Sequence, residues 1–192
     1  MKVNEIFYSI QGEGAHTGTP AVFVRFSGCN LRCSFCDTEH QKGMPMTEQE
    51  IINAVLQYPA RLVVFTGGEP TLQLSKNIVD ALHDANRIVA IETNGTRPIH
   101  AKVDWITLSP KFEFTYDAEL ALLTCNELKV VWTGTNDLSR YNNIVADRYY
   151  LQPCDTGDAV ANAEIINSLV KYIKQNPKWQ ISLQTQKILK VR

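Results

Sequence analysis

The chain has 192 residues, of which 44% are hydrophobic and 20% charged, so it has the length of one domain and can bury a core. This composition excludes an intrinsically disordered protein. The net charge of −1 at pH 7 and the absence of a basic cluster disfavour nucleic acid as a direct partner, because phosphate binding needs clustered positive charge.

No segment predicts export or membrane insertion. Residues 1–8 mix charged and apolar side chains and lack the continuous apolar region of a signal peptide. No apolar run approaches the length that spans a bilayer. We therefore expect a cytoplasmic protein with one domain, residues 1–192, and no membrane partner.

Segment 8–14, with the sequence YSIQGEG, precedes the first predicted strand, residues 22–26. Two glycines around an acid are typical of a loop close to a ligand, and equally of a plain tight turn. The strand itself carries Arg25 among apolar neighbours. A buried arginine needs a carboxylate or phosphate partner, and that partner is either a ligand or an internal acid.

A loop with three cysteines follows this strand. Cys29, Cys33 and Cys36 lie close together in a chain with five cysteines, which favours metal ligation over a disulfide framework. Three thiolates can each bind one iron of a cubane cluster and leave the fourth iron open to a ligand. The alternative is a structural zinc site, which needs a fourth ligand, and His40 is the nearby candidate.

Three polar motifs follow the next predicted strands along the chain. They are residues 66–70 (TGGEP) after strand 62–65, residues 92–96 (ETNGT) after strand 88–91, and residues 109–111 (SPK) after strand 105–108. Each motif alone is compatible with a simple turn. A further predicted strand, 128–132, contains Lys129, which needs an acidic or polar partner if its ammonium is buried and otherwise extends to water.

The remaining signals define the fold class. Further strands are predicted at 149–151 and 181–184. Apolar and polar residues do not alternate along the predicted strands, as expected for strands buried on both faces. Helices are indicated by a capping box from Thr47 to Glu50, by apolar spacing around Ile78, and by Asp158 before a long helix that closes at Asn176. We predict an α/β fold, an incomplete (open) parallel βα barrel of about six strands, because a closed barrel typically needs about 250 residues. The active site is expected at the carboxyl ends of the strands.

The spacing Cys-x3-Cys-x2-Cys, with an aromatic residue before the third cysteine, resembles the signature of the radical S-adenosylmethionine (radical SAM) superfamily. The TGGEP motif resembles the superfamily segment that holds the methionine amino group. The resemblance implies that S-adenosylmethionine chelates the open iron of a 4Fe-4S cluster. An electron from the cluster then cleaves the sulfonium to give a 5′-deoxyadenosyl radical.

Nearly the whole chain resembles the 7-carboxy-7-deazaguanine synthase family. The segments that carry this resemblance are 5–14, 25–31, 36–38, 66–70, 92–96, 109–111, 127–129 and 151–153. The resemblance implies a lyase that converts 6-carboxy-5,6,7,8-tetrahydropterin to 7-carboxy-7-deazaguanine with loss of ammonia, in queuosine and 7-deazapurine biosynthesis. It also implies S-adenosylmethionine regeneration, a Mg²⁺ ion, a homodimer, and an electron donor such as flavodoxin or ferredoxin.

The resemblance also implies a role for each matching residue. The cluster ligands are Cys29, Cys33 and Cys36. The residues that contact S-adenosylmethionine are Phe35, Cys36, Asp37, Gly67, Gly68, Glu69, Gly95, Ser109, Pro110 and Lys111. The residues that contact the pterin are Ile10, Gln11, Gly12, Glu13, Arg25 and Thr93. Thr38 is the implied protein ligand of Mg²⁺, with substrate oxygen and water completing the shell.

Two positions depart from the family pattern. Gln186 stands where the family more often has histidine, and Cys154 stands where methionine often follows Gln-Pro. Glutamine cannot take a proton as histidine does, which puts a proton-shuttle role in doubt. Cys154 and the isolated Cys125 are expected to be ordinary buried residues. Two other functions remain open: a radical activase that acts on a glycine of a partner protein, and a non-catalytic zinc or cluster module.

Overall fold

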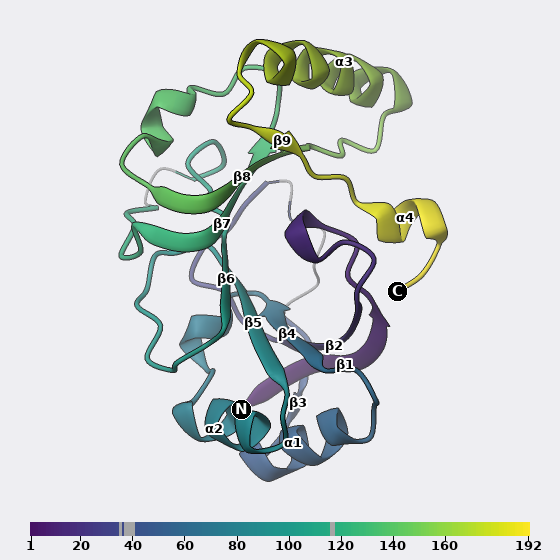
Figure 1. The fold of residues 1–192 in the computed structure, drawn as a ribbon, viewed down its shortest axis with the longest axis vertical. Helices are drawn as coiled ribbons and strands as arrows, with labels where there is room; N and C mark the ends of the chain where they lie inside the picture. Colours follow the sequence, from purple (N-terminus) through teal and green to yellow (C-terminus); the bar gives the residue numbers. More distant parts are fainter. Residues whose placement is uncertain (35, 37–40, 116–117) are drawn as a thin grey trace.

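The computed structural model describes residues 1–34, 36, 41–115 and 118–192. These residues form a nine-stranded sheet in the order β3-β1-β2-β4-β5-β6-β7-β8-β9, which curves around a concave side (Figure 1). The strands are β1 (Lys2–Ile10), β2 (Pro20–Phe26), β3 (Met44–Pro45), β4 (Leu62–Gly67), β5 (Ile88–Thr93), β6 (Trp105–Leu108), β7 (Thr124–Trp132), β8 (Val145–Pro153) and β9 (Gln180–Ile181).

Neighbouring strands from β2 to β9 pair in parallel, whereas β1 pairs antiparallel with both β2 and β3. The sheet does not close on itself. The predicted open, mostly parallel α/β fold is therefore confirmed. Parallel pairing brings the carboxyl ends of these strands to one edge, where the three polar motifs that follow β4, β5 and β6 meet.

The strand β1 was absent from the sequence prediction. Its pairing with β2 changes register between Val3 and Glu5, and such a bulge breaks the period-two alternation by which a strand is recognised. Val3 and Phe7 are nevertheless buried. The prediction of about six strands thus omitted β1 and the two-residue β3, and the strand predicted at 181–184 is limited to Gln180–Ile181.

Four α-helices lie in the described residues: α1 (Glu48–Leu56), α2 (Lys76–Asp84), α3 (Ala159–Gln175) and α4 (Thr185–Leu189). The predicted capping box is present, because the Thr47 side chain accepts from the Glu50 backbone N–H and the Glu50 carboxylate accepts from the Thr47 backbone N–H. Asp158 caps α3 by accepting from two backbone N–H groups. Helix α4 was not predicted, because its five residues are too few for a periodic signal.

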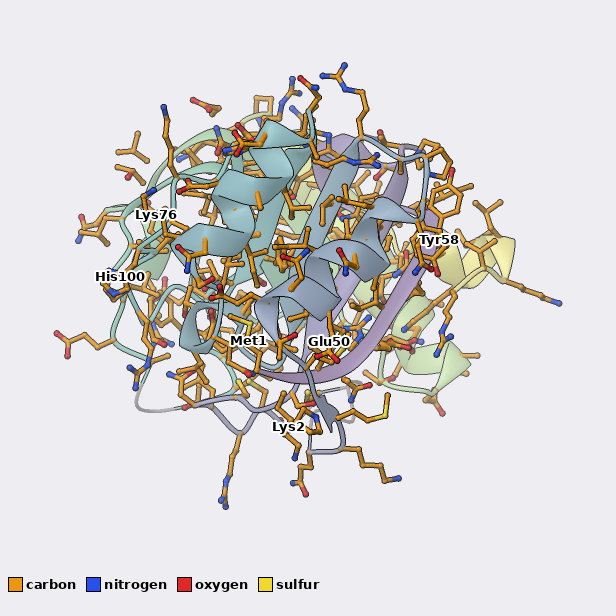
Figure 2. The ribbon with its side chains drawn as sticks, turned by 90° about the horizontal axis from the view of Figure 1, so that it is seen from below. Met1, Lys2, Glu50, Tyr58, Lys76 and His100 are labelled. Atoms are coloured by element: carbon orange, nitrogen blue, oxygen red, sulfur yellow. The ribbon has the colours of Figure 1, made fainter. Side chains whose placement is uncertain are left out.

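The core lies in layers on both sides of the sheet. Helices α1 and α2 cover the outer face of β2, β4 and β5, as the view from below shows, with Glu50 marking α1 and Lys76 marking α2 (Figure 2). Helix α3 packs with β7 and β8 around Leu128, Leu151 and Leu169. In the part of the chain that the structure describes, no helix is long and apolar enough to cross a membrane.

Candidate active site

A cavity of ≈ 1230 Å³ lies at the carboxyl ends of the parallel strands. Its wall includes the ends of β4, β5 and β8, the segment after β6, and the carboxyl-terminal half of β7. Two segments from the ends of the chain complete it. They are residues 10–13, which comprise the end of β1 and the start of the loop to β2, and the C-terminal segment that contains α4. Figure 1 shows this loop, in purple, on the concave side of the sheet beside α4.

The cysteine loop forms one side of this cavity. Cys29, Cys33 and Cys36 all line it, and the Cys36 backbone N–H donates to the Cys33 carbonyl at 3.3 Å. Burial raises the pKa of the Cys33 thiol, and the Lys111 ammonium acts in the opposite direction. A bound metal or cluster would favour the thiolate form in the same way.

The donor set of this loop fits an iron–sulfur cluster. Three soft thiol donors on one cavity wall suit a cubane, in which each sulfur binds a different iron. Among the described residues, no three His, Cys, Asp or Glu side chains are placed to hold a single metal ion. Cys29, Cys33 and Cys36 could hold a 4Fe-4S cluster with one open iron, because all three thiols line the same cavity. The alternative zinc ligand, His40, lies outside the described residues.

The glycines of the TGGEP motif press against the cysteine loop. The Gly68 backbone N–H donates to the Phe26 carbonyl at 3.0 Å, and the Glu69 backbone N–H donates to the Gly28 carbonyl at 2.9 Å. A Cβ atom on Gly68 would lie 1.8 Å from the Gly28 carbonyl oxygen. The glycine is therefore required for this close approach, and it fixes the loop immediately before Cys29.

The Glu69 side chain lies behind this loop, fully buried. Its carboxylate accepts from the Thr93 hydroxyl at 2.7 Å and from the Asn94 backbone N–H at 2.8 Å. It also accepts from the Thr71 backbone N–H and hydroxyl. These contacts join the end of β4 to the end of β5, and four donors compensate the burial of the charge.

An acidic and basic network forms another part of the wall. Lys129 on β7 donates to a Glu13 carboxylate oxygen at 2.5 Å and lies 3.8 Å from a Glu92 carboxylate oxygen. Gln11 donates to Glu92 at 3.0 Å. The lysine whose partner the sequence left open thus has two internal acids, both on the cavity wall.

The C-terminal segment holds the same loop from the other side. The Gln184 and Gln186 side-chain amides each donate to a Glu13 carboxylate oxygen at 3.0 Å. Thr185 donates to the Gly12 carbonyl through both its backbone N–H, at 3.1 Å, and its hydroxyl, at 2.9 Å. Gln184 was missed as a site residue, because nothing in its local sequence indicates a contact with a loop so far away along the chain.

Arg25 has an internal acid and also faces the cavity. Its Nε lies 2.9 Å from a Glu5 carboxylate oxygen, and Arg25 and Glu5 both line the cavity. The other Glu5 oxygen contacts Arg192 at 2.5 Å. Of the two partners that the sequence left open for Arg25, the structure provides the internal carboxylate.

The structure brings most of the predicted site residues to this one cavity. Those on its wall are Ile10, Gln11, Gly12, Glu13, Arg25, Cys29, Cys33, Cys36, Gly67, Gly68, Thr93, Ser109 and Lys111. Three do not line it: Glu69 is turned toward β5, Pro110 lies between two lining residues, and Gly95 packs against the Leu108 side chain. Phe35, Asp37 and Thr38 lie outside the described residues.

Comparison with known proteins agrees with this geometry. The model of the Radical SAM superfamily matches residues 23–111. A 7-carboxy-7-deazaguanine synthase from Bacteroides thetaiotaomicron is 48% identical, and the match covers 100% of this chain and 98% of the relative. One from Burkholderia multivorans is 40% identical, with 98% of both chains covered. This chain belongs to the 7-carboxy-7-deazaguanine synthase family.

A solved structure supports the same family. The crystal structure of QueE from Escherichia coli superposes with a TM-score of 0.75 and 25% identity, covering 95% of this chain and 93% of that one. The family predicted from the motifs is therefore confirmed, and so is the predicted radical SAM type of the open α/β fold. A 4Fe-4S cluster and S-adenosylmethionine are the cofactors that this superfamily implies, as predicted.

The two departures from the synthase family pattern both lie at the cavity. Gln186 donates to Glu13 and so anchors the loop that carries the predicted pterin contacts. Cys154 follows the end of β8, and its backbone N–H donates to the Trp132 carbonyl at 2.8 Å. Cys154 is therefore a wall residue, and not the isolated buried residue that its sequence context indicates.

Proposed function

We propose that this chain is a 7-carboxy-7-deazaguanine synthase that converts 6-carboxy-5,6,7,8-tetrahydropterin to 7-carboxy-7-deazaguanine with loss of ammonia. The observation that carries the proposal is one cavity with two different walls. Three cysteine thiols form one wall, and the Gln11–Glu92 and Glu13–Lys129 contacts form another. The cavity volume of ≈ 1230 Å³ exceeds that of a typical small-ligand site, as two ligands side by side require.

The cysteine wall would hold the cofactors. Cys29, Cys33 and Cys36 would bind the cluster, which together with S-adenosylmethionine supplies the one-electron chemistry that opens the reaction. Gly67 and Gly68 leave backbone groups accessible beside this loop. Lys111 donates to the Ser109 hydroxyl at 2.6 Å and interacts electrostatically with both Cys33 and Glu13. Its positive charge suits a carboxylate such as that of the methionine group.

The other wall would hold the pterin. Arg25 presents a guanidinium that can bind the substrate carboxylate, and Glu5 holds it in place. Glu13 and Glu92 provide carboxylate oxygens for the N–H groups of the pyrimidine ring. Thr93 and Gln11 add neutral hydrogen-bonding groups. These residues would orient the substrate relative to the cofactor and exclude water, and such positioning accounts for much of catalysis in cofactor enzymes.

We further propose Thr38 as a ligand of Mg²⁺, a homodimeric enzyme, and a small electron-transfer protein such as flavodoxin or ferredoxin as the reductant. The support for Thr38 is its position two residues after Cys36, the last cysteine of the cluster motif. One hydroxyl is enough for Mg²⁺ when substrate oxygens and water complete its octahedral shell.

Anaerobic turnover followed by mass analysis tests the reaction. The reconstituted protein is incubated with the carboxypterin, S-adenosylmethionine, Mg²⁺ and a strong reductant. We expect a product lighter than the substrate by one ammonia that keeps its carboxylate. Cleavage of S-adenosylmethionine with no change in the pterin would contradict the proposal and would favour the activase alternative.

A further inference from the structure

The ammonium of Lys129 is buried at the cavity wall, and Lys129 is not one of the predicted site residues. It lies on β7 with a side chain that is 7% exposed. Its Nζ lies 2.5 Å from Glu13 and 3.8 Å from Glu92. A buried charge is retained only where partners compensate its desolvation. These partners come from two other parts of the fold, the loop after β1 and the end of β5.

Four charged groups interact electrostatically with the ammonium. Glu13, Glu92 and Glu127 are acidic, and Lys111 is basic. Burial lowers the pKa of Lys129, but the charge of Glu13, followed by that of Glu92, outweighs it, so its pKa is raised. Burial also lowers the pKa of Lys111, as does the neighbouring charge of Lys129. Of the three acids, Glu13 and Glu92 line the cavity, and their carboxylate oxygens suit ligand groups that donate hydrogen bonds.

Three side chains donate hydrogen bonds to the Glu13 carboxylate. One of its oxygens accepts from the Gln184 and Gln186 amides, and the other accepts from Lys129. Burial raises the pKa of Glu13, but the charge of Lys129 and these hydrogen bonds lower it to about 2. A carboxylate offers roughly four acceptor positions. The three donors therefore leave capacity for a ligand N–H on the cavity side.

We propose that Lys129 is a positioning residue for the substrate: its ammonium holds the Glu13 carboxylate ionised and in one orientation, ready to accept from the N–H groups of the substrate's pyrimidine ring. This inference rests on the proposed function. It assigns Lys129 a role through Glu13, without direct contact with the pterin. Loss of the lysine should therefore affect pterin binding and leave S-adenosylmethionine binding intact.

The test is a double-mutant cycle in the reconstituted enzyme. The variants are Lys129→Met, Glu13→Gln and the two together, with Lys129→Arg as the conservative change. Lys76→Met is the matched control, because it removes a lysine from an exposed ion pair with Asp80 on α2. Iron content and the Kd for S-adenosylmethionine report whether each variant keeps its fold and cofactor site.

We expect Lys129→Met to raise the KM for the carboxypterin by at least about tenfold, the value of a lost charge-assisted contact. The double variant should be no worse than Glu13→Gln alone, because Lys129 acts through Glu13. Lys129→Arg should recover part of the loss. Lys76→Met should behave as wild type in every measurement.

The pH profile separates positioning from a structural role. Without the ammonium, burial raises the pKa of Glu13, so its carboxylate becomes protonated at higher pH than in wild type. The kcat/KM of Lys129→Met should then fall as pH decreases and recover as pH increases. Wild type should show no such limb from Glu13, whose pKa of about 2 lies below the assay range.

Three results would overturn the inference. The first is a Lys129→Met variant with the wild-type KM and pH profile, and the second is a double variant whose losses simply add. If Lys129→Met does not fold, the double variant, which leaves the net charge unchanged, is measured in its place. A wild-type KM for the carboxypterin in the double variant is the third result that would overturn the inference. Failure of wild type to convert the pterin at all would instead overturn the proposed function, and this inference with it.

Discussion

The Glu69 carboxylate accepts a hydrogen bond of 2.8 Å from the Asn94 backbone N–H, and this contact joins the turn after β4 to the turn after β5. The Thr93 hydroxyl donates to the same carboxylate at 2.7 Å. The first turn lines the cavity through Gly68 and the second through Asn94. Glu69 therefore fixes the relative position of two segments that are predicted to contact the cofactor and the substrate.

Replacement of Glu69 by glutamine should destabilise the protein. An amide offers one acceptor oxygen in place of two, so buried donors such as the Asn94 N–H or the Thr93 hydroxyl lose their partner. Each such loss costs about 1–3 kcal/mol. We expect the free energy of unfolding of the cluster-free protein in urea to fall by this amount. Glu164→Gln, at an exposed position on α3, is the control. Equal stability of the two variants would contradict the role of Glu69 in joining the two turns.

Cluster content should depend on three of the five cysteines. We expect Cys29→Ala, Cys33→Ala and Cys36→Ala each to lose the brown 4Fe-4S chromophore and turnover, because each thiolate binds a different iron. Cys125→Ala is the matched control. Cys125 lies on β7 and, unlike these three cysteines, does not line the cavity, so its loss should leave the cluster in place. Full iron content in Cys33→Ala would show that the ligand set is wrong.

Arg25→Ala should weaken substrate binding much more than S-adenosylmethionine binding. A partly desolvated arginine–carboxylate contact is worth about 1.5–3 kcal/mol, which corresponds to roughly ten- to a hundredfold in affinity. The two Kd values are measured separately by anaerobic titration, with the exposed Arg140→Ala as control. If Arg25 serves only its pair with Glu5, the variant will lose thermal stability and bind the pterin normally.

Turnover should increase with Mg²⁺, and the increase should depend on Thr38. Loss of a ligand hydroxyl in Thr38→Ala should remove the Mg²⁺ response and leave iron content and S-adenosylmethionine binding unchanged. Thr38→Ser keeps the hydroxyl and should keep the response. If Thr38 only caps a turn, Thr38→Ala will lose iron and the remaining enzyme will respond to Mg²⁺ as wild type does.

The sequence predicted the parts of this protein that depend on local patterns. Buried parallel strands such as β4 are continuous apolar runs, and the Thr47–Glu50 capping box is a short-range signal that the structure reproduces. The cysteine and TGGEP motifs also lie on contiguous residues. For such features, the physical cause lies within a few residues. Strand β4 and the start of α1 were therefore predicted correctly.

Contacts between distant segments could not be predicted. Lys129 and Glu13 are 116 residues apart in sequence, so the need of Lys129 for a partner was visible but the partner was not. The hydrogen bond from Gln186 to the same acid joins residues that are 173 positions apart in sequence. Likewise, the pattern of β1 was obscured by its bulge after Val3. These features depend on how the chain closes around the cavity, which no single segment encodes.

We propose that this cavity holds the carboxypterin beside a reusable S-adenosylmethionine. The most direct measurement is the number of product molecules formed for each molecule of S-adenosylmethionine when that cofactor is limiting. The protein is reconstituted anaerobically, given excess carboxypterin, Mg²⁺ and reductant, and the 7-carboxy-7-deazaguanine is quantified by mass spectrometry. We predict many products for each S-adenosylmethionine, with little methionine released. One methionine released for each turnover, or no deazaguanine product at all, would contradict the account.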